Sequence, residues 1–66
     1  MKLIVNGESR EVTDVSSVAE LLTHFKLERK ILVVELNRTI IERERYADTA
    51  LNDGDQLEIV HFVGGG

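Results

Sequence analysis

The stretch KLIVNGESREVT, residues 2–13, predicts the β-hairpin on which the rest of the fold is built. Its first residues favour a β-strand and are followed by Asn6-Gly7. This pair supplies the positive φ angles required by a two-residue type I′ turn. Beyond the turn the residues alternate between two faces as far as Thr13, which is the period of a strand. The chain therefore begins with two antiparallel strands.

The next segment, SSVAELLTHF (residues 16–25), changes from the period of a strand to that of an α-helix. Its apolar residues fall at i, i+3, i+4 and i+7, namely Val18, Leu21, Leu22 and Phe25. Ser17 and Glu20 have the spacing of a capping box, in which each side chain bonds the backbone N–H of the other residue. We therefore expect a helix from about Val18 to Phe25, with Leu27 packed beneath its end.

Three further strands are expected, at residues 31–36, 39–41 and 56–62. The run ILVVEL at 31–36 is short and nearly continuous in hydrophobicity, which is typical of an interior strand. Asn37 and Arg38 turn the chain into the next strand. A turn precedes the last strand, with Gly54 in the left-handed conformation. One helical turn is expected near Tyr46.

The resulting order, β-β-α-β-β-β, predicts the α+β class. One helix across one sheet is the simplest way to bury both apolar surfaces. We expect a single ubiquitin-like β-grasp domain over residues 1–62, in which a mixed sheet of about five strands carries one main helix across one face. The first and last strands are expected to pair in parallel at its centre, and residues 63–66 to form a flexible glycine tail.

The size and charge of the chain limit what it can do. At 66 residues its core leaves little material for a deep substrate pocket, so we expect a protein that is not itself an enzyme. Eight basic and twelve acidic residues give a net charge of −4, which argues against nucleic acid binding. With no long apolar run and no leader, we expect no membrane association and a cytoplasmic location. Without cysteine, thiol catalysis and thiolate-bound metals are excluded.

Strand alternation divides the apolar residues of the sheet between its two faces. The positions expected to face the helix are Leu3, Val5, Val34, Leu36, Leu57 and Ile59. Ile4, Val33, Val60 and Phe62 then lie on the open face, where an antiparallel or mixed sheet usually shows polar residues. Scattered exposed apolar residues are normal in proteins. A cluster close to the C-terminus favours a partner-binding surface instead, and this is the interpretation that we prefer.

Most candidate sites of other kinds have an ordinary explanation. His24 and His61 lack further ligands at metal-binding spacing, so no metal site is expected. The acidic residues Asp53, Asp55 and Glu58 do not form the ligand series of a calcium loop and indicate turn chemistry. The ending VGGG lacks the lysine and the following helix of a phosphate-binding loop.

The glycine ending offers a different chemistry. Four extended residues, Val63 to Gly66, reach roughly 13–14 Å beyond the last strand. Glycine adopts any conformation that a narrow channel imposes, and the carboxylate of Gly66 is ionised at neutral pH. Such a carboxylate can attack the α-phosphate of ATP in the active site of another protein. A disordered terminus or a remnant of cloning could also end in a run of glycines. The tail alone does not decide between these interpretations.

With the residues before it, the tail becomes specific. The segment NDGDQLEIVHFVGGG (52–66) resembles the C-terminal signature of the ThiS family, the sulfur carriers of thiamine biosynthesis: an Asp-Gly-Asp turn, an apolar strand and a terminal Gly-Gly. MKLIVNGE (1–8), SVAELL (17–22) and VVELNRTIIERERYADTAL (33–51) resemble the opening hairpin, helix start and middle of that family. The family often has proline in place of Glu42 and tryptophan in place of Tyr46.

The resemblance implies a carrier that other proteins act upon. An E1-like, zinc-containing enzyme of the ThiF type would adenylate Gly66 with ATP and magnesium. A sulfur-relay protein would supply sulfur for a thiocarboxylate, and a thiazole synthase of the ThiG type would accept it. Gly65 and Gly66 are then the functional pair, Gly64 is a hinge, and Val63 lies in the partner-binding segment. No cofactor is expected on the chain itself.

Three alternatives remain open from the sequence. The small subunit of molybdopterin synthase also has a β-grasp fold and a Gly-Gly end, but it is usually longer and tends to carry prolines before the tail. In a ubiquitin-like modifier, Gly66 would be joined to a lysine of a target protein. The third alternative, from a different class, is an interaction module with an inert tail.

Overall fold

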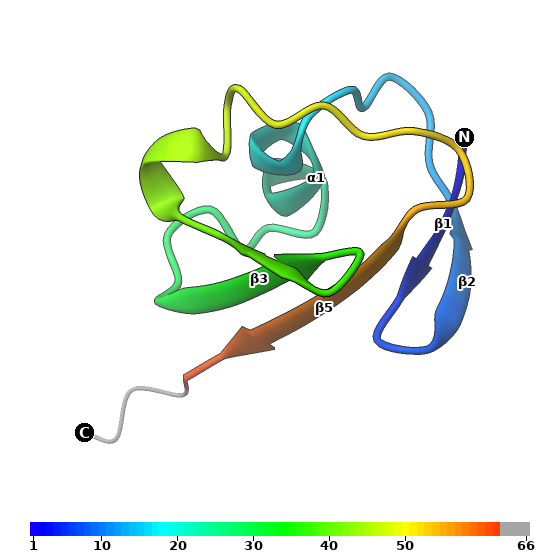
Figure 1. The fold of residues 1–66 in the computed structure, drawn as a ribbon. Helices are drawn as coiled ribbons and strands as arrows, with labels where there is room; N and C mark the ends of the chain where they lie inside the picture. The colour runs from blue at the N-terminus through cyan, green and yellow to red at the C-terminus, as the bar shows by residue number, and fades with distance from the viewer. Residues whose placement is uncertain (63–66) are drawn as a thin grey trace.

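The computed structural model describes residues 1–62 and shows a five-stranded sheet crossed on one face by a single α-helix (Figure 1). The elements are β1 (Lys2–Val5), β2 (Glu8–Glu11), α1 (Val18–His24), β3 (Leu32–Leu36), β4 (Thr39–Ile41), the 3-10 turn η1 (Arg43–Arg45) and β5 (Gln56–His61). The strand order is β2-β1-β5-β3-β4, and β1 and β5 are parallel at the centre. The α+β prediction and the expected parallel central pair are confirmed.

Two tight turns with the same geometry connect the hairpins. Asn6 and Gly7 have φ values of 52° and 81°, and Asn37 and Arg38 have φ values of 50° and 71°. Positive φ at both central residues is the mark of a type I′ turn, whose twist matches that of the flanking strands. Asparagine tolerates this conformation better than most residues. The predicted turns are therefore confirmed.

The two asparagines also bind β5 from opposite sides. The side-chain amide of Asn6 donates to the carbonyl of Ile59 at 3.1 Å, and the N–H of Ile59 donates to the Asn6 Oδ1 at 2.8 Å. We call these two bonds the asparagine staple. On the other side, the N–H of Gln56 donates to the Asn37 Oδ1 at 3.0 Å, and the Asn37 N–H donates to the carbonyl of Gln56 at 2.8 Å. Turn residues thus complete the pairing of the central strand.

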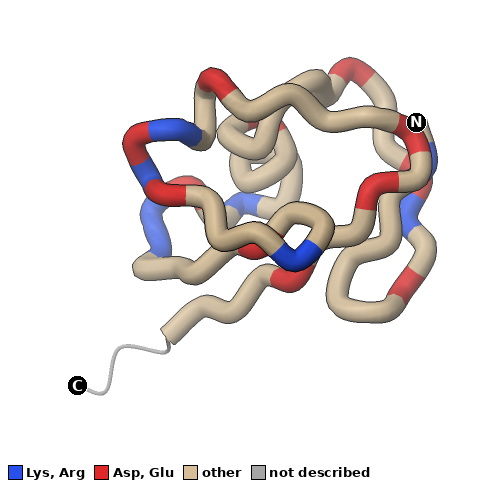
Figure 2. Tube along the Cα trace, in the orientation of Figure 1, with Lys and Arg blue, Asp and Glu red and all other residues tan. Residues whose placement is uncertain are grey.

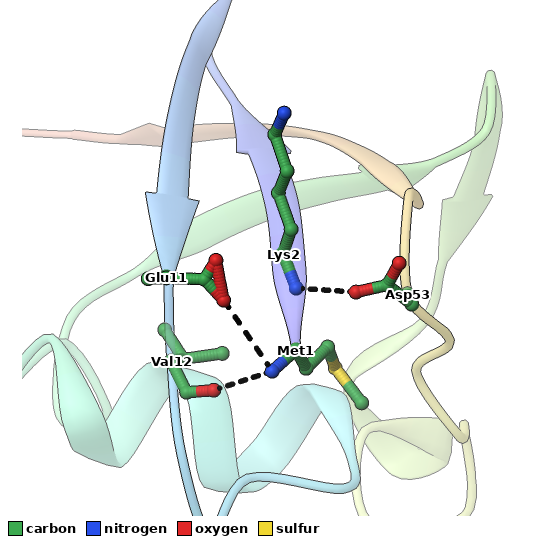
Figure 3. Close-up of polar contacts among 5 residues, drawn as sticks. All are labelled: Met1, Lys2, Glu11, Val12 and Asp53. Atoms are coloured by element: carbon green, nitrogen blue, oxygen red, sulfur yellow. Dashed lines mark hydrogen bonds and ion pairs between the residues drawn. The ribbon is translucent and has the colours of Figure 1, made fainter.

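The start of β1 is held by the turn that precedes β5. The N–H of Lys2 donates to the Asp53 Oδ1 at 2.6 Å, and the N–H of Ile4 donates to the carbonyl of Asp55 at 2.9 Å. Figure 3 shows the first of these bonds beside the ammonium group of Met1, which donates to the carbonyl of Val12 at 3.0 Å. The parallel pairing of β1 with β5 is thereby prolonged into the loop before β5.

The core lies between α1 and the sheet. Its buried residues are Leu3, Val5, Val12, Val15, Val18, Leu21, Leu22, Val34, Leu51, Leu57 and Ile59. Five of the six residues expected to face the helix are among them, and Leu36 packs against their edge. Full burial of one such side chain contributes about 1.5–3 kcal/mol, so packing of this one face supplies most of the driving force for folding. Phe25 and Leu27 pack against the core half-buried, as expected.

The N-terminus of α1 differs from the expected capping box in one bond. The Ser17 Oγ accepts from the Glu20 N–H at 3.2 Å, as predicted. The carboxylate of Glu20 does not reach back to the N–H of Ser17. It accepts instead from the N–H of Ser16 at 2.6 Å and from the Ser16 hydroxyl at 2.8 Å. Ser16 offers two donors to one charged acceptor, and this pair of bonds replaces the single bond of the standard box.

Four element ends also differ slightly from the expectations: β2 ends at Glu11 and not at Thr13, and β3 begins at Leu32 and not at Ile31. Phe25 is the C-cap of α1 and not its last residue, and β5 ends at His61 and not at Phe62. The N–H of Phe62 still donates to the carbonyl of Ile31 at 3.1 Å, so the pairing with the segment before β3 continues one step past the strand.

The asparagine staple gives a first prediction. Asn6→Gly removes both side-chain bonds but keeps a residue that accepts positive φ. We expect it to lower the free energy of unfolding by about 1–3 kcal/mol, because each bond contributes about 0.5–1.5 kcal/mol. Urea unfolding followed by circular dichroism measures the change. Asn52→Gly is the matched control, since residues 1–62 offer no hydrogen bond to the side chain of that exposed asparagine. Equal losses in the two variants would contradict the role of the staple.

The helix cap gives a second prediction, in pH dependence. The hydrogen bond from the Ser16 hydroxyl, followed by that from the Ser16 N–H, holds the pKa of Glu20 below its ordinary value. A group with a lowered pKa in the folded state stabilises that state at neutral pH, and the contribution is lost as the pH falls through the folded pKa. The stability difference between wild type and Glu20→Gln should therefore be largest at neutral pH and shrink in acid. A difference that is constant from pH 7 to pH 3 in urea titrations would contradict this assignment.

Candidate functional site

The face of the sheet that α1 does not cover carries a continuous apolar surface. All the large hydrophobic residues that are exposed within residues 1–62 belong to it: Ile31, Val33, Ile40, Val60 and Phe62. We call these five residues the open-face patch. Their exposed fractions range from 36% for Val33 to 72% for Ile31. A cluster of this kind on one face commonly marks a partner site.

Strand register brings the patch together. Val33 of β3 lies directly opposite Val60 of β5. Ile31 and Phe62, joined by a backbone hydrogen bond, continue the same ladder two residues further and therefore lie on the same face. Ile40 of β4 extends the surface to the edge of the sheet, since it lies opposite Glu35, the open-face neighbour of Val33. Residues up to 31 positions apart in the sequence thus form one surface.

Of the four residues predicted for this face, Val33, Val60 and Phe62 are exposed there. Ile4 lies on the same face, but it is half-buried and sits at the border of the patch. Ile31 and Ile40 also lie on this face but were not predicted for it. Counting alternate positions back from Val33 would have found Ile31. Ile40 requires the β3–β4 register, which follows from the position of the two-residue turn.

An acidic pair borders the patch. Glu35 and Glu58 are directly opposite each other on neighbouring strands. They line a hollow of about 410 Å³ together with Ile4, Arg38 and Gln56. Like charges at opposite positions of a sheet are destabilising. Within residues 1–62 no cation lies within ion-pairing distance of either carboxylate. The open face therefore combines an apolar surface with a negative border.

The end of β5 emerges beside this patch. The asparagine staple binds β5 at Ile59, where β1 has already turned away. Beyond that point His61 pairs only with Leu32 of β3. In Figure 1 the end of β5 accordingly extends past the β1–β2 hairpin. The expectations for Val63, Gly64, Gly65 and Gly66, including a flexible tail, lie outside the described residues.

The two histidines and the acidic residues of the last turn have ordinary positions in the structure. His24 and His61 are both exposed and lie on different elements. Within residues 1–62 no three histidine or acidic residues are arranged to hold a metal ion. Asp53 and Asp55 accept from the backbone N–H groups of Lys2 and Asn52, which confirms turn chemistry for these two residues. It is wrong for Glu58, which lies within β5. No helix of the described part is long and apolar enough to cross a membrane.

A second hollow, of about 420 Å³, lies on the helix side of the sheet. Thr13, Asp14, Glu20 and His24 are among its lining residues. It is similar in size to the hollow on the open face, but it is lined by α1 and the preceding loop, and the sheet lies between it and the patch. Its polar lining belongs to the helix cap and the loop before it, so we assign it no part in the function.

Comparison with known proteins is consistent across sequence and structure. The family model for the ThiS family matches residues 3–66. The sulfur carrier protein ThiS of Bacillus subtilis is 51% identical over 53 residues, which are 80% of this chain and 80% of that protein. The crystal structure of the thiamine biosynthesis protein ThiS from Geobacter metallireducens superimposes with a TM-score of 0.83 at 40% identity, and the match covers all of both chains.

A longer relative contains a similar segment. A thiazole synthase of Paramagnetospirillum magneticum is 44% identical over 66 residues, which are all of this chain but only 20% of that protein. The chain thus spans about one fifth of the length of this relative. The family match over residues 3–66, the Bacillus relative and the shared fold agree with one another. The chain belongs to the ThiS family of sulfur carrier proteins, which have the ubiquitin-like β-grasp fold and take part in thiamine biosynthesis.

Proposed function

We propose that the α-carboxylate of Gly66 is the group on which this carrier transports sulfur. The family match that extends through residue 66 carries the proposal. The described fold supports it, because β5 continues past its pairing with β1 as far as His61, close to the end of the chain. A terminal glycine offers an unhindered acyl group to an incoming nucleophile.

The chemistry has two steps, and the catalytic groups belong to other proteins. First, the carboxylate of Gly66 attacks the α-phosphate of ATP, forming an acyl-adenylate and releasing pyrophosphate. Second, a sulfide equivalent supplied by a sulfur-relay protein attacks the acyl carbon and displaces AMP. One carboxylate oxygen leaves with AMP, so the product is a thiocarboxylate at Gly66. The chain itself supplies the acyl group and the surface by which it is held.

The partners proposed are an E1-like adenylating enzyme of the ThiF type and a thiazole synthase of the ThiG type, acting in the cytoplasm where ATP is available. The second partner is supported by the thiazole synthases that contain a segment similar to this chain. Covalent linkage of two proteins in one chain favours their working together, because it replaces a bimolecular encounter with an intramolecular one.

We further propose that these partners dock on the open-face patch. It surrounds the end of β5, so an enzyme bound there holds the tail at a fixed distance from its active site. The apolar residues provide the buried centre that an interface needs, and Glu35 and Glu58 provide a negative border. The expected complementary surface is therefore apolar with basic residues beside it.

The sulfur transfer is tested by intact mass. With ATP, magnesium, a sulfide source and the matching activating enzyme, the 66-residue protein should gain the mass of one oxygen-to-sulfur exchange, about 16 Da. A chain shortened by Gly66 is the matched control and should gain nothing, while circular dichroism shows its fold unchanged. An unchanged mass of the full chain with active enzyme would contradict the proposal. A mass gain equal to a whole target protein would indicate a modifier instead.

The docking surface is tested by a charge placed in the patch. Val60→Asp should weaken binding to the activating enzyme by about tenfold or more, because it buries an unpaired carboxylate at the interface. Isothermal titration calorimetry measures the affinity. Ser9→Asp is the matched control, since it adds the same charge to an exposed position of the same face outside the patch. Equal affinities of the two variants would show that the patch is not the docking surface.

A further inference from the structure

The two edges of the sheet are protected to very different degrees. An edge strand exposes a row of unpaired backbone groups, and natural proteins usually guard such edges with charged side chains. The edge strand β2 has the sequence ESRE and is guarded by three charges. The edge strand β4 has the sequence TII and carries no charge, and the side chain of Ile40 is 64% exposed. The edge at β4 is therefore open to another strand.

The hairpin register shows which backbone groups of β4 point outward. Leu36 and Thr39 close a two-residue turn, so they exchange backbone hydrogen bonds with each other. Pairs alternate along an antiparallel ladder, and the next pair, Glu35 and Ile40, is therefore not hydrogen-bonded to each other. Ile40 then turns its N–H and its carbonyl away from β3. Within β4 the outward residue is therefore Ile40, with Glu42 following it in extended backbone and Arg38 preceding it in the left-handed conformation of the turn.

We propose that β4 pairs with β4 of a second copy of this chain, antiparallel and two-fold symmetric about Ile40. A symmetric interface is self-complementary, so each contact occurs twice. With Ile40 opposite Ile40 of the second copy, the turn that carries Arg38 in each chain lies beside Glu42 of the other. A shift to the next allowed register would put Ile40 opposite Glu42 or Arg38 and lose both charge pairs. Charge therefore selects the centred register.

The side chains concerned all lie on the same face. Ile40 is on the open face, Arg38 lines the hollow on that face, and Glu42 follows Ile40 by two residues in extended backbone. Within residues 1–62, neither Arg38 nor Glu42 has an ion-pair partner. Figure 2 shows acidic and basic positions alternating along the segment that leaves β4. Both members of the pair are thus available to a second copy.

The geometry has a consequence for the open-face patch. A two-fold axis perpendicular to the sheet keeps the open faces of both copies on the same side, and the two Ile40 side chains join the two patches. Three-residue strands bury little area, which is typical of transient contacts. The dimer therefore forms at high protein concentration and dissociates on dilution. The dimer joins the open-face patches of two copies that are not bound to an enzyme. The monomer remains available to bind one.

Sedimentation velocity on the full 66-residue protein tests the pairing at concentrations from about 1 μM to about 1 mM. The average mass should rise toward that of a dimer. Arg38→Glu and Glu42→Arg should each weaken association about tenfold or more, because like charges then face each other. The double variant should restore association, since both charge pairs between the two copies are then present with their signs exchanged. Val60→Asp, two strands away, should leave association unchanged.

Amide hydrogen exchange gives a second measurement that depends on the backbone. The N–H of Ile40 should become protected as the concentration rises, while that of Thr39, already bonded to Leu36, should not change. A protein that stays monomeric throughout would overturn the proposal. So would association that is lost in Val60→Asp but kept in both charge variants, which would indicate face-to-face contact.

Protection of Ile40 only after the activating enzyme is added would show that the edge accepts a strand from that enzyme. Because no step of this test requires sulfur transfer, its failure leaves the proposed function untouched.

Discussion

The parallel pairing of β1 with β5 is the contact on which the rest of the structure depends. It joins segments about 50 residues apart, with Val5 opposite Leu57 and the asparagine staple one step further. Only two residue pairs form the regular ladder, and side-chain and loop bonds at both ends supply the remainder. The other strands build outward from this pair, with β2 beside β1, β3 beside β5, and β4 beside β3. A short central ladder is sufficient because the core residues Leu3 and Leu57 on its helix side are fully or almost fully buried.

The point at which β1 stops also decides what β5 can do. A longer β1 would cover the second edge of β5 as far as His61 and fix that segment on both sides. Instead the chain turns at Asn6, and the Asn6 side chain makes the last bonds to β5, at Ile59. The strand is thus held firmly at its middle and on one side only at its end. The end of β5 is therefore less constrained by the sheet than its middle.

Much of this architecture could be predicted from the sequence because its signals are local. Asn6-Gly7, the helical spacing of Val18 and Leu21, and the Asp-Gly-Asp turn each depend on residues close together in the chain. The alternation of Val60 and Phe62 against Leu57 and Ile59 likewise assigned the two faces of β5. What could not be predicted depends on contacts between distant segments. The staple requires Asn6 to lie beside Ile59, 53 residues later, and no local pattern reports that. The preference of Glu20 for Ser16 depends on the exact path of the chain into the helix.

The apolar open face is best understood as a consequence of size. Within residues 1–62 this small chain has one α-helix, which covers only one face of the sheet. Apolar side chains such as Val33 and Val60 on the other face therefore add little to the core, and threonine there would suit a strand equally well. Their presence has a cost in solubility, which the net charge of −4 offsets. The opposed carboxylates of Glu35 and Glu58 have a cost in stability as well. Neither feature is required by the fold, whereas both favour a complementary protein surface. These features support the proposed docking of a partner on the open face.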